Sequence, residues 1–123
     1  MTAYLRRGEL NRYVEVQKKS GTEDSFGGEV QDWTALKSVY AKIEVLQGRE
    51  LVAAQAIVTE VSHRITVQYD IDLWADPKAA IAMRIVYRKP GVTDRVFDIR
   101  ACMNIDEEDR AIELLAFEGM TNG

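Results

Sequence analysis

Alternation of apolar and polar residues with a period of two is the feature that most constrains how this chain can fold. Successive side chains of a β-strand point to opposite faces, so each alternating run predicts a strand with one buried face. Gly, Ser, Asp and Pro separate the runs and indicate turns between them. The runs lie in seven segments, 12–19, 30–33, 38–45, 61–70, 83–89, 95–102 and 111–117, and together they predict about six strands.

The alternation also predicts which side chains face the core. On the first strand Val14 and Val16 face inward, whereas Tyr13, Glu15 and Gln17 face outward. On the later strands the predicted inward residues are Val39, Ala41, Ile43, Val45, Val61, His63, Ile65, Val67, Tyr69, Tyr87, Phe97, Ile99 and Ala101.

The remaining segments are assigned from turn signals and propensity. Residues 20–33 read as a long loop or open hairpin, and residues 72–82 as a loop or short turn. The strands at 83–89 and 95–102 form a predicted hairpin across "PGVTD". The run 111–117 favours helix by propensity, but we predict a strand because the domain needs a closing edge.

These features predict an all-β fold in one domain that spans residues 1–123. A chain of 123 residues suffices for one core. Short strands at this frequency are typical of a small barrel or sandwich, and we expect a β-barrel of mostly antiparallel strands. One inserted loop or short helix, at about 46–60, interrupts the pattern. Helix is expected over 48–58, where Leu51, Ala54 and Val58 recur at helical spacing.

Composition excludes several classes of protein. No apolar run approaches the length of about 18 residues that spans a bilayer. The first ten residues lack the apolar stretch of a secretory signal, so we expect the protein in a cytoplasm. The single Cys102 excludes an internal disulfide. The net charge of −4 argues against non-specific binding of nucleic acid, although it suits a wall that DNA passes without contact.

The residues that carry chemistry in enzymes do not form a recognisable constellation here. His63 is the only histidine, and its place in an apolar row predicts a partly buried ring that is hydrogen-bonded within the sheet. Cys102 lies in a predicted strand and is expected to be a packed thiol. The acidic residues 106–109 lack the glycine and ligand spacing of a calcium loop, and indicate a solvated turn. We therefore predict no catalytic, cofactor-binding or metal-binding residues.

Two further clusters remain open to interpretation. Gly27 and Gly28 lack the context of a phosphate-binding loop and indicate a tight turn. Arg6, Arg7 and Arg12 form a small basic cluster, which either docks on an acidic partner or is an exposed tail without a function.

The ordered landmarks of the chain resemble those of a known family. They are "RRGELNRYVEVQ", "DSFGGEVQDWTAL", "VYAKIEVLQGREL", "VSHRITVQY", "MRIVYR", "RVFDIRA" and "NIDEEDRAIELLAFE". The series resembles the head–tail joining proteins, also called head-closure or stopper proteins, of tailed phages and gene-transfer particles. It departs from the family at Gln68-Tyr69, where many members carry Arg-Tyr, and in a longer hairpin between Arg88 and Arg95.

The resemblance implies a small β-barrel with a long insertion that acts by assembly. It implies a homo-oligomeric ring below the portal and its adaptor, which closes the DNA-filled head and docks a tail terminator or tail-completion protein. DNA passes through the ring without sequence-specific binding. The location would be the virion, after assembly in the host cytoplasm, and Arg6, Arg7 and Arg12 are candidates for the contact on the portal side.

The segment "VLQGRELVAAQAIVTE", residues 45–60, matches the region where the family inserts a loop between two strands. Gly48 permits a break in the backbone, and Arg49 and Glu50 suit an ion pair across an interface or a lining of the channel. The alternative is a plain surface helix that covers one end of the barrel. Under the resemblance, the residues expected to line the channel or contact a neighbour are Gln47, Gly48, Arg49, Glu50, Leu51, Ala54 and Gln55.

Two other functions are compatible with a small β-rich chain. A tail-terminator subunit is also a compact ring-forming protein. A small-barrel nucleic-acid module would need aromatic and basic residues on one outer face, whereas Tyr69, Tyr87 and Phe97 lie on predicted inward rows.

Overall fold

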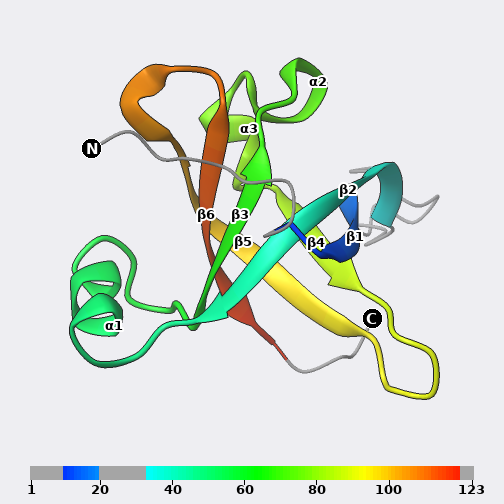
Figure 1. The fold of residues 1–123 in the computed structure, drawn as a ribbon, viewed down its shortest axis with the longest axis horizontal. Coiled ribbons are helices and arrows are strands. Elements are labelled where there is room, and N and C mark those ends of the chain that lie inside the picture. The colour runs from blue at the N-terminus through cyan, green and yellow to red at the C-terminus, as the bar shows by residue number, and fades with distance from the viewer. Residues whose placement is uncertain (1–9, 20–32, 120–123) are drawn as a thin grey trace, which may run out of the picture.

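The computed structural model describes residues 10–19 and 33–119, which form strands with a few short helices. In chain order the elements are β1 (Arg12–Lys19), β2 (Trp33–Val45), α1 (Gly48–Gln55), β3 (His63–Gln68), α2 (Ile71–Trp74), α3 (Pro77–Ala80), β4 (Met83–Tyr87), β5 (Arg95–Asn104), the 3₁₀ turn η2 (Ile105–Glu107) and β6 (Ala111–Glu118). Figure 1 shows the strands crossing one another around a common interior, with α1 standing apart from α2 and α3.

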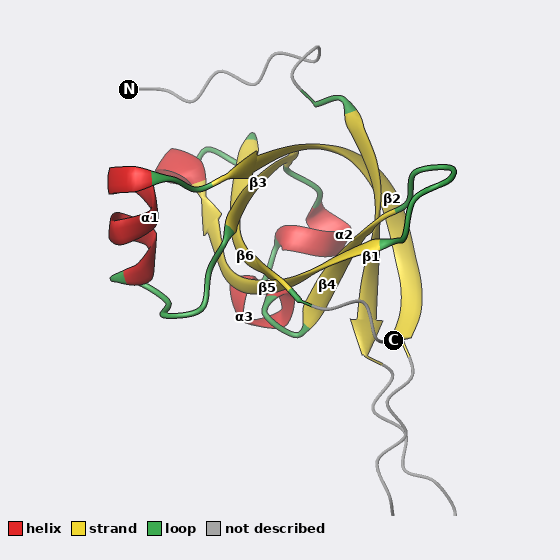
Figure 2. Cartoon of the chain, turned by 90° about the horizontal axis from the view of Figure 1, so that it is seen from below, coloured by secondary structure: helices red, strands yellow, loops and turns green. Residues whose placement is uncertain are grey.

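The six strands close into a barrel, which confirms the predicted fold class. Their order around the barrel is β1-β2-β3-β6-β5-β4, and each neighbouring pair, including β4 with β1, is antiparallel. Figure 2 looks along the barrel and shows the strands as a ring. A closed barrel leaves no unpaired strand edge, so any contact with another molecule must use side chains or loops.

The barrel interior is filled by the inward rows of the alternating strands. Side chains that are at most 2% exposed include Val14, Val16, Ile65, Val67, Ile85, Phe97, Ile99, Ile112 and Leu114. Tyr69 and Tyr87 are partly buried against this cluster, as predicted. The segment 111–117 is part of β6, which confirms that it is a strand despite its helical propensity.

Two short helices close one end of the barrel, where we predicted a loop or short turn. Asp70 and Asp76 accept hydrogen bonds from the backbone N–H two residues later, and so begin α2 and α3. The helices bury Leu73, Trp74 and Ala80 in the main core. The prediction was wrong because helices of four residues are too short to show a helical period in the sequence.

Three details of strand pairing also differ from the prediction. The runs at 30–33 and 38–45 were predicted as separate strands, but β2 is continuous from Trp33 to Val45, and residues 30–32 lie outside the described residues. Val45 is 58% exposed rather than inward, because it is the last residue of β2. Ala101 follows a register shift after Ile99 and packs under α1 instead of in the barrel.

Gln17 was predicted to face outward but is 6% exposed. The register of β1 with β2 shifts between Val16 and Gln17, and this irregularity breaks the strict alternation of faces. Arg84 Nε donates a hydrogen bond to Gln17 Oε1 at 2.7 Å, so the buried amide has a partner.

Candidate functional site

The candidate site is the segment 46–62, which connects β2 to β3 and contains α1. Hydrogen bonds fix its base to the barrel: Leu46 N–H donates to Ser62 O at 3.0 Å, and Ser62 N–H donates to Ala116 O at 2.9 Å. Figure 2 shows α1 outside the ring of strands rather than over its opening. The segment is therefore a lateral projection of the barrel wall.

A second hydrophobic cluster holds α1 against the barrel. Leu46, Ala54, Val61 and Leu115 are buried in it, and Leu51, Val58, Ala101 and Met103 pack around them. Leu51, Ala54 and Val58 face the walls of β5 and β6, as their spacing predicted. The helix was expected over 48–58 but ends at Gln55, so Val58 packs from the turn that follows it. Because Leu51 and Ala54 face their own barrel, their part in the site is to orient α1.

Gly48 turns the chain from β2 into α1. Its φ is +56°, which is the left-handed region, and no heavy atom lies within 4 Å of a Cβ built on it. The predicted break in the backbone at this glycine is confirmed. The preceding Gln47 is extended and makes no side-chain cap, so the turn depends on Gly48 itself.

We expect Gly48→Ala to lower the free energy of unfolding by about 1 kcal/mol, because an L-residue is strained at positive φ. The space around the position is open, so a steric clash adds nothing. Thermal or urea unfolding measures the loss, and Gly48→Asn should lose less because asparagine tolerates this region. A fully neutral Gly48→Ala variant would contradict this account of the turn.

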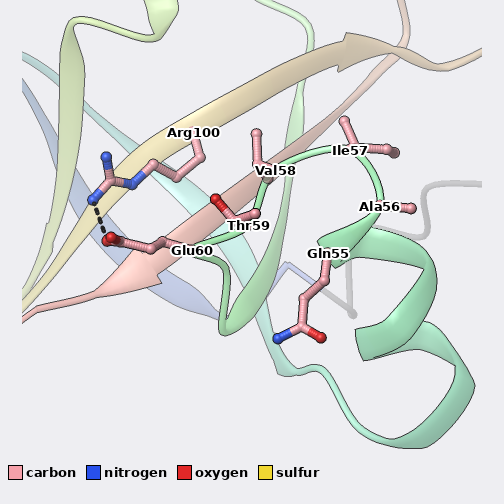
Figure 3. A pocket seen from close by; sticks show the side chains of 7 residues that line it. All are labelled: Gln55, Ala56, Ile57, Val58, Thr59, Glu60 and Arg100. Carbon is pink, nitrogen blue, oxygen red and sulfur yellow. Dashed lines mark hydrogen bonds and ion pairs between the residues drawn. The ribbon is translucent and has the colours of Figure 1, made fainter.

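The charged residues of the segment are partly engaged with their own barrel. Arg64 contacts Glu50 at 3.6 Å and Glu44 at 3.3 Å. Arg100 on β5 contacts Glu60 at 3.4 Å, as Figure 3 shows. Glu50 therefore has a partner within the chain, although its side chain is 59% exposed. All three pairs are at least partly exposed to solvent and contribute little to stability.

Two apolar side chains are exposed in the segment, Val52 on α1 and Ile57 directly after the helix. Val52 is 68% exposed and Ile57 is 61% exposed, and Arg49 lies on the same short segment. A hollow of about 430 Å³ follows the end of the helix, where Figure 3 shows Gln55 and Ile57 among the side chains around it. The hollow is open and lacks a cluster of titratable groups, so it resembles a contact surface more than a binding pocket for a small molecule.

His63 lies where the segment rejoins the barrel, and its ring is buried at 7% exposure. Ser62 Oγ lies 2.8 Å from Nδ1 and accepts a hydrogen bond from Glu118 N–H at 2.9 Å. On the other side of the ring, Nε2 lies 3.5 Å from Arg95 Nη2 and 3.8 Å from Glu118 Oε1. Phe97 packs edge-on against the ring. The predicted buried and hydrogen-bonded histidine is confirmed.

Burial lowers the pKa of His63 below its ordinary value of 6.5; Glu118 opposes the shift and Arg95 adds to it. The unfolded chain therefore binds the His63 proton more readily than the folded chain, and the free energy of unfolding falls as pH drops below 6.5. Glu15, Asp70 and Glu118 have lowered pKa values, so the stability that these carboxylates contribute is lost only at more acidic pH.

We expect His63→Gln to flatten the dependence of stability on pH between roughly pH 5 and 7, which urea unfolding at a series of pH values measures. Glu118→Gln is the matched control, because it removes the facing carboxylate and keeps the histidine. If the free energy of unfolding of His63→Gln still depends on pH as in the unaltered protein, another group causes that dependence.

Other candidate groups show no sign of chemistry. Burial raises the pKa of Cys102 to about 11, so the thiol is protonated and unreactive at neutral pH, as predicted for a packed cysteine. Among residues 10–19 and 33–119, no group of three or more His, Cys, Asp or Glu side chains is placed to hold a metal ion. No helix in the described part of the chain is long and apolar enough to cross a membrane.

The structure describes only one residue of the basic cluster, Arg12. Arg6 and Arg7 lie outside the described residues. Arg12 is exposed at the start of β1, with its guanidinium 6.0 Å from the centre of the Tyr87 ring. Together with Lys89 and Arg95 it borders a hollow of about 240 Å³ beside the β4–β5 hairpin. Arg95 is held there by Glu118, with Nε to Oε2 at 2.7 Å and Nη2 to Oε1 at 3.0 Å.

The sequence reasoning missed one exposed surface. Tyr13 and Tyr40 lie opposite each other on β1 and β2, with ring centres 4.8 Å apart. Their exposure was predictable for Tyr13, which was assigned to the outward row, but their proximity depends on strand register, which the sequence alone leaves undetermined. Val52 and Ile57 were detectable as apolar residues off the buried stripe of α1.

Two solved structures share this fold. Protein SF1141 from Shigella flexneri 2a aligns with a TM-score of 0.71 at 20% identity, over 96% of this chain and 100% of that one. A chain in the virion of a native gene transfer agent particle aligns with a TM-score of 0.53 at 20% identity, over 91% of this chain and 97% of that one. At 20% identity, each of these matches shows a shared fold.

The family follows from the sequence. No curated protein matches the chain significantly. The sequence model of the phage head completion proteins matches residues 5–119, which is nearly the whole chain and includes every element described above. The predicted resemblance is therefore confirmed, and the chain belongs to the phage head completion protein family, as a structural component of the virion.

Proposed function

We propose that this protein is a connector subunit that closes the DNA-filled head. In this proposal its copies form a ring below the portal and adaptor, and the ring presents the docking surface for a tail terminator or tail-completion protein. The family match over residues 5–119 carries the proposal. The closed barrel supports it, since the described residues offer side-chain surfaces for assembly and no catalytic constellation.

In this proposal residues 1–123 form a single domain, and this domain does not hold the DNA that passes it. The net charge of −4 would repel the phosphate backbone, so DNA would pass through the ring without being held. The alternative of a nucleic-acid module has less support, because Phe97 is fully buried and Tyr69 and Tyr87 pack against the core.

The segment 46–62 is the part of the subunit that we assign to the channel or to a neighbouring copy. Gln47, Arg49 and Gln55 are exposed on it and are available for such contacts. Gly48, Leu51 and Ala54 set the direction and the seat of α1 on the barrel. Arg12, with Arg6 and Arg7, is assigned to the contact with the adaptor or portal, and the basic hollow that Arg12 borders suits an acidic partner surface.

Adding the purified protein back to filled heads that lack it tests this function. We expect the heads to retain DNA against nuclease and to become competent to accept tails. Heads that leak as much DNA with the protein as without it would contradict a closing role. Ile81→Asp, at an exposed position outside the segment 46–62, serves as a folded comparison.

A further inference from the structure

The pair Tyr13 and Tyr40 forms an exposed aromatic surface on the outer wall of β1 and β2. The two side chains are 57% and 58% exposed, and their rings are tilted by 52° against each other. Tyrosine offers a large apolar face with a negative π-surface at small entropic cost, and it is enriched in protein interfaces. This pair is the surface that we call the tyrosine wall.

The outward face of α1 has the complementary chemistry. Val52 supplies an exposed apolar group, and the exposed Arg49, three residues earlier on the helix, supplies a guanidinium. A guanidinium stacks favourably on a tyrosine ring, and the barrel itself uses such contacts, with Arg84 lying 4.2 Å from the ring centre of Trp33. Because the second hydrophobic cluster fixes α1 to its own barrel, this face is presented as a rigid surface.

The two surfaces lie on opposite sides of the barrel. In the strand order β1-β2-β3-β6-β5-β4, β6 is three strands from β1 in either direction, and β5 is three strands from β2. The tyrosine wall lies on β1 and β2, whereas α1 packs on β5 and β6. Figure 2 shows the same relation, with α1 on one side of the ring of strands and β1 and β2 on the other.

We propose that the outward face of α1 in one copy docks on the tyrosine wall of the next copy, head to tail. Arg49 then stacks on the tyrosine rings, and Val52 covers their apolar faces. A contact between two different surfaces of one chain repeats from copy to copy and closes a ring when the rotation between copies closes, whereas a single self-complementary patch stops at a dimer. The inference rests on the ring of the proposed function and names the surfaces that build it.

A disulfide trap in assembled particles tests the contact. Val52→Cys and Tyr40→Cys are combined in a Cys102→Ala background, and the particles are oxidised and separated without reductant. We expect a ladder of multimers from the double variant, because each copy then links two neighbours, and monomers from either single variant. Dimers from a single variant, or monomers only from the double variant, would overturn the head-to-tail contact.

A charge swap tests the same contact without relying on disulfide geometry. Arg49→Glu and Tyr40→Lys are each expected to reduce incorporation into particles by about tenfold or more, as for loss of an interface anchor. The double variant should recover most of the loss, because the introduced lysine and glutamate attract each other across the contact. Ile81→Asp, at a comparably exposed apolar site directly after α3, is the matched control.

The outcomes separate this inference from the proposed function. If the single variants enter particles as well as the control, or if the double variant does not recover incorporation, the assigned surfaces are wrong. Neither result contradicts a ring that retains DNA. Particles that are assembled without the protein and still keep their DNA and tails would overturn the proposed function itself.

Discussion

Replacement of Trp74 by alanine is expected to lower the free energy of unfolding by about 3–5 kcal/mol, the largest loss we expect from one substitution. Trp74 is 1% exposed and reaches from α2 into the main core at one end of the barrel. Its removal leaves a cavity beside side chains of several strands, which cannot collapse without opening the barrel. Chemical unfolding followed by far-UV circular dichroism measures the loss.

Trp74→Phe is the matched control for this prediction. The indole Nε1 is buried and has no hydrogen-bond partner among the described residues, so its removal leaves no partner group unsatisfied. We therefore expect the phenylalanine variant to lose much less stability than the alanine variant. Equal losses for the two variants would contradict the claim that the ring volume seals this end of the barrel.

Excision of the segment between β2 and β3 is expected to leave the barrel folded but to abolish closure of the head. In this variant Asn-Gly replaces residues 47–61, so that Leu46 meets Ser62 through a two-residue hairpin turn. The interior cluster contains no residue of the excised segment, which is why the barrel should persist. Leu115→Thr is added because excision uncovers this side chain on β6.

Particles assembled with the excised protein are expected to release their DNA to nuclease, since the segment is assigned to the channel or the subunit contact. The matched control carries Leu115→Thr alone and keeps the segment. Circular dichroism of the purified variant reports the fold. An unfolded variant would show that the segment is part of the folding core, and a folded variant with DNA-tight particles would exclude it from closure.

The barrel was predictable because its strands alternate with period two. Val14 and Val16 on β1, and Ile65 and Val67 on β3, gave the inward rows directly, and all four are buried. The pattern failed where one residue is inserted into the pairing. The register shifts beside Gln17 and before Ala101 reverse the expected faces, and nothing local in the sequence marks them.

The candidate site was predictable in part. The helical spacing of Leu51, Ala54 and Val58 indicated α1 within the strand pattern, and Gly48 indicated the break before it. The partner of Glu50 was not predictable, because Arg64 reaches it only through the pairing of β2 with β3. For the same reason the tyrosine wall emerged only from the register of β1 with β2.

The central claim, that this protein closes the filled head, is tested most directly by electron microscopy of particles assembled without it. The account predicts free tails beside heads that were packaged and have leaked their DNA. Normal complete particles would contradict a connector function, and filled, stable heads with tails of uncontrolled length would contradict head closure and indicate a tail terminator.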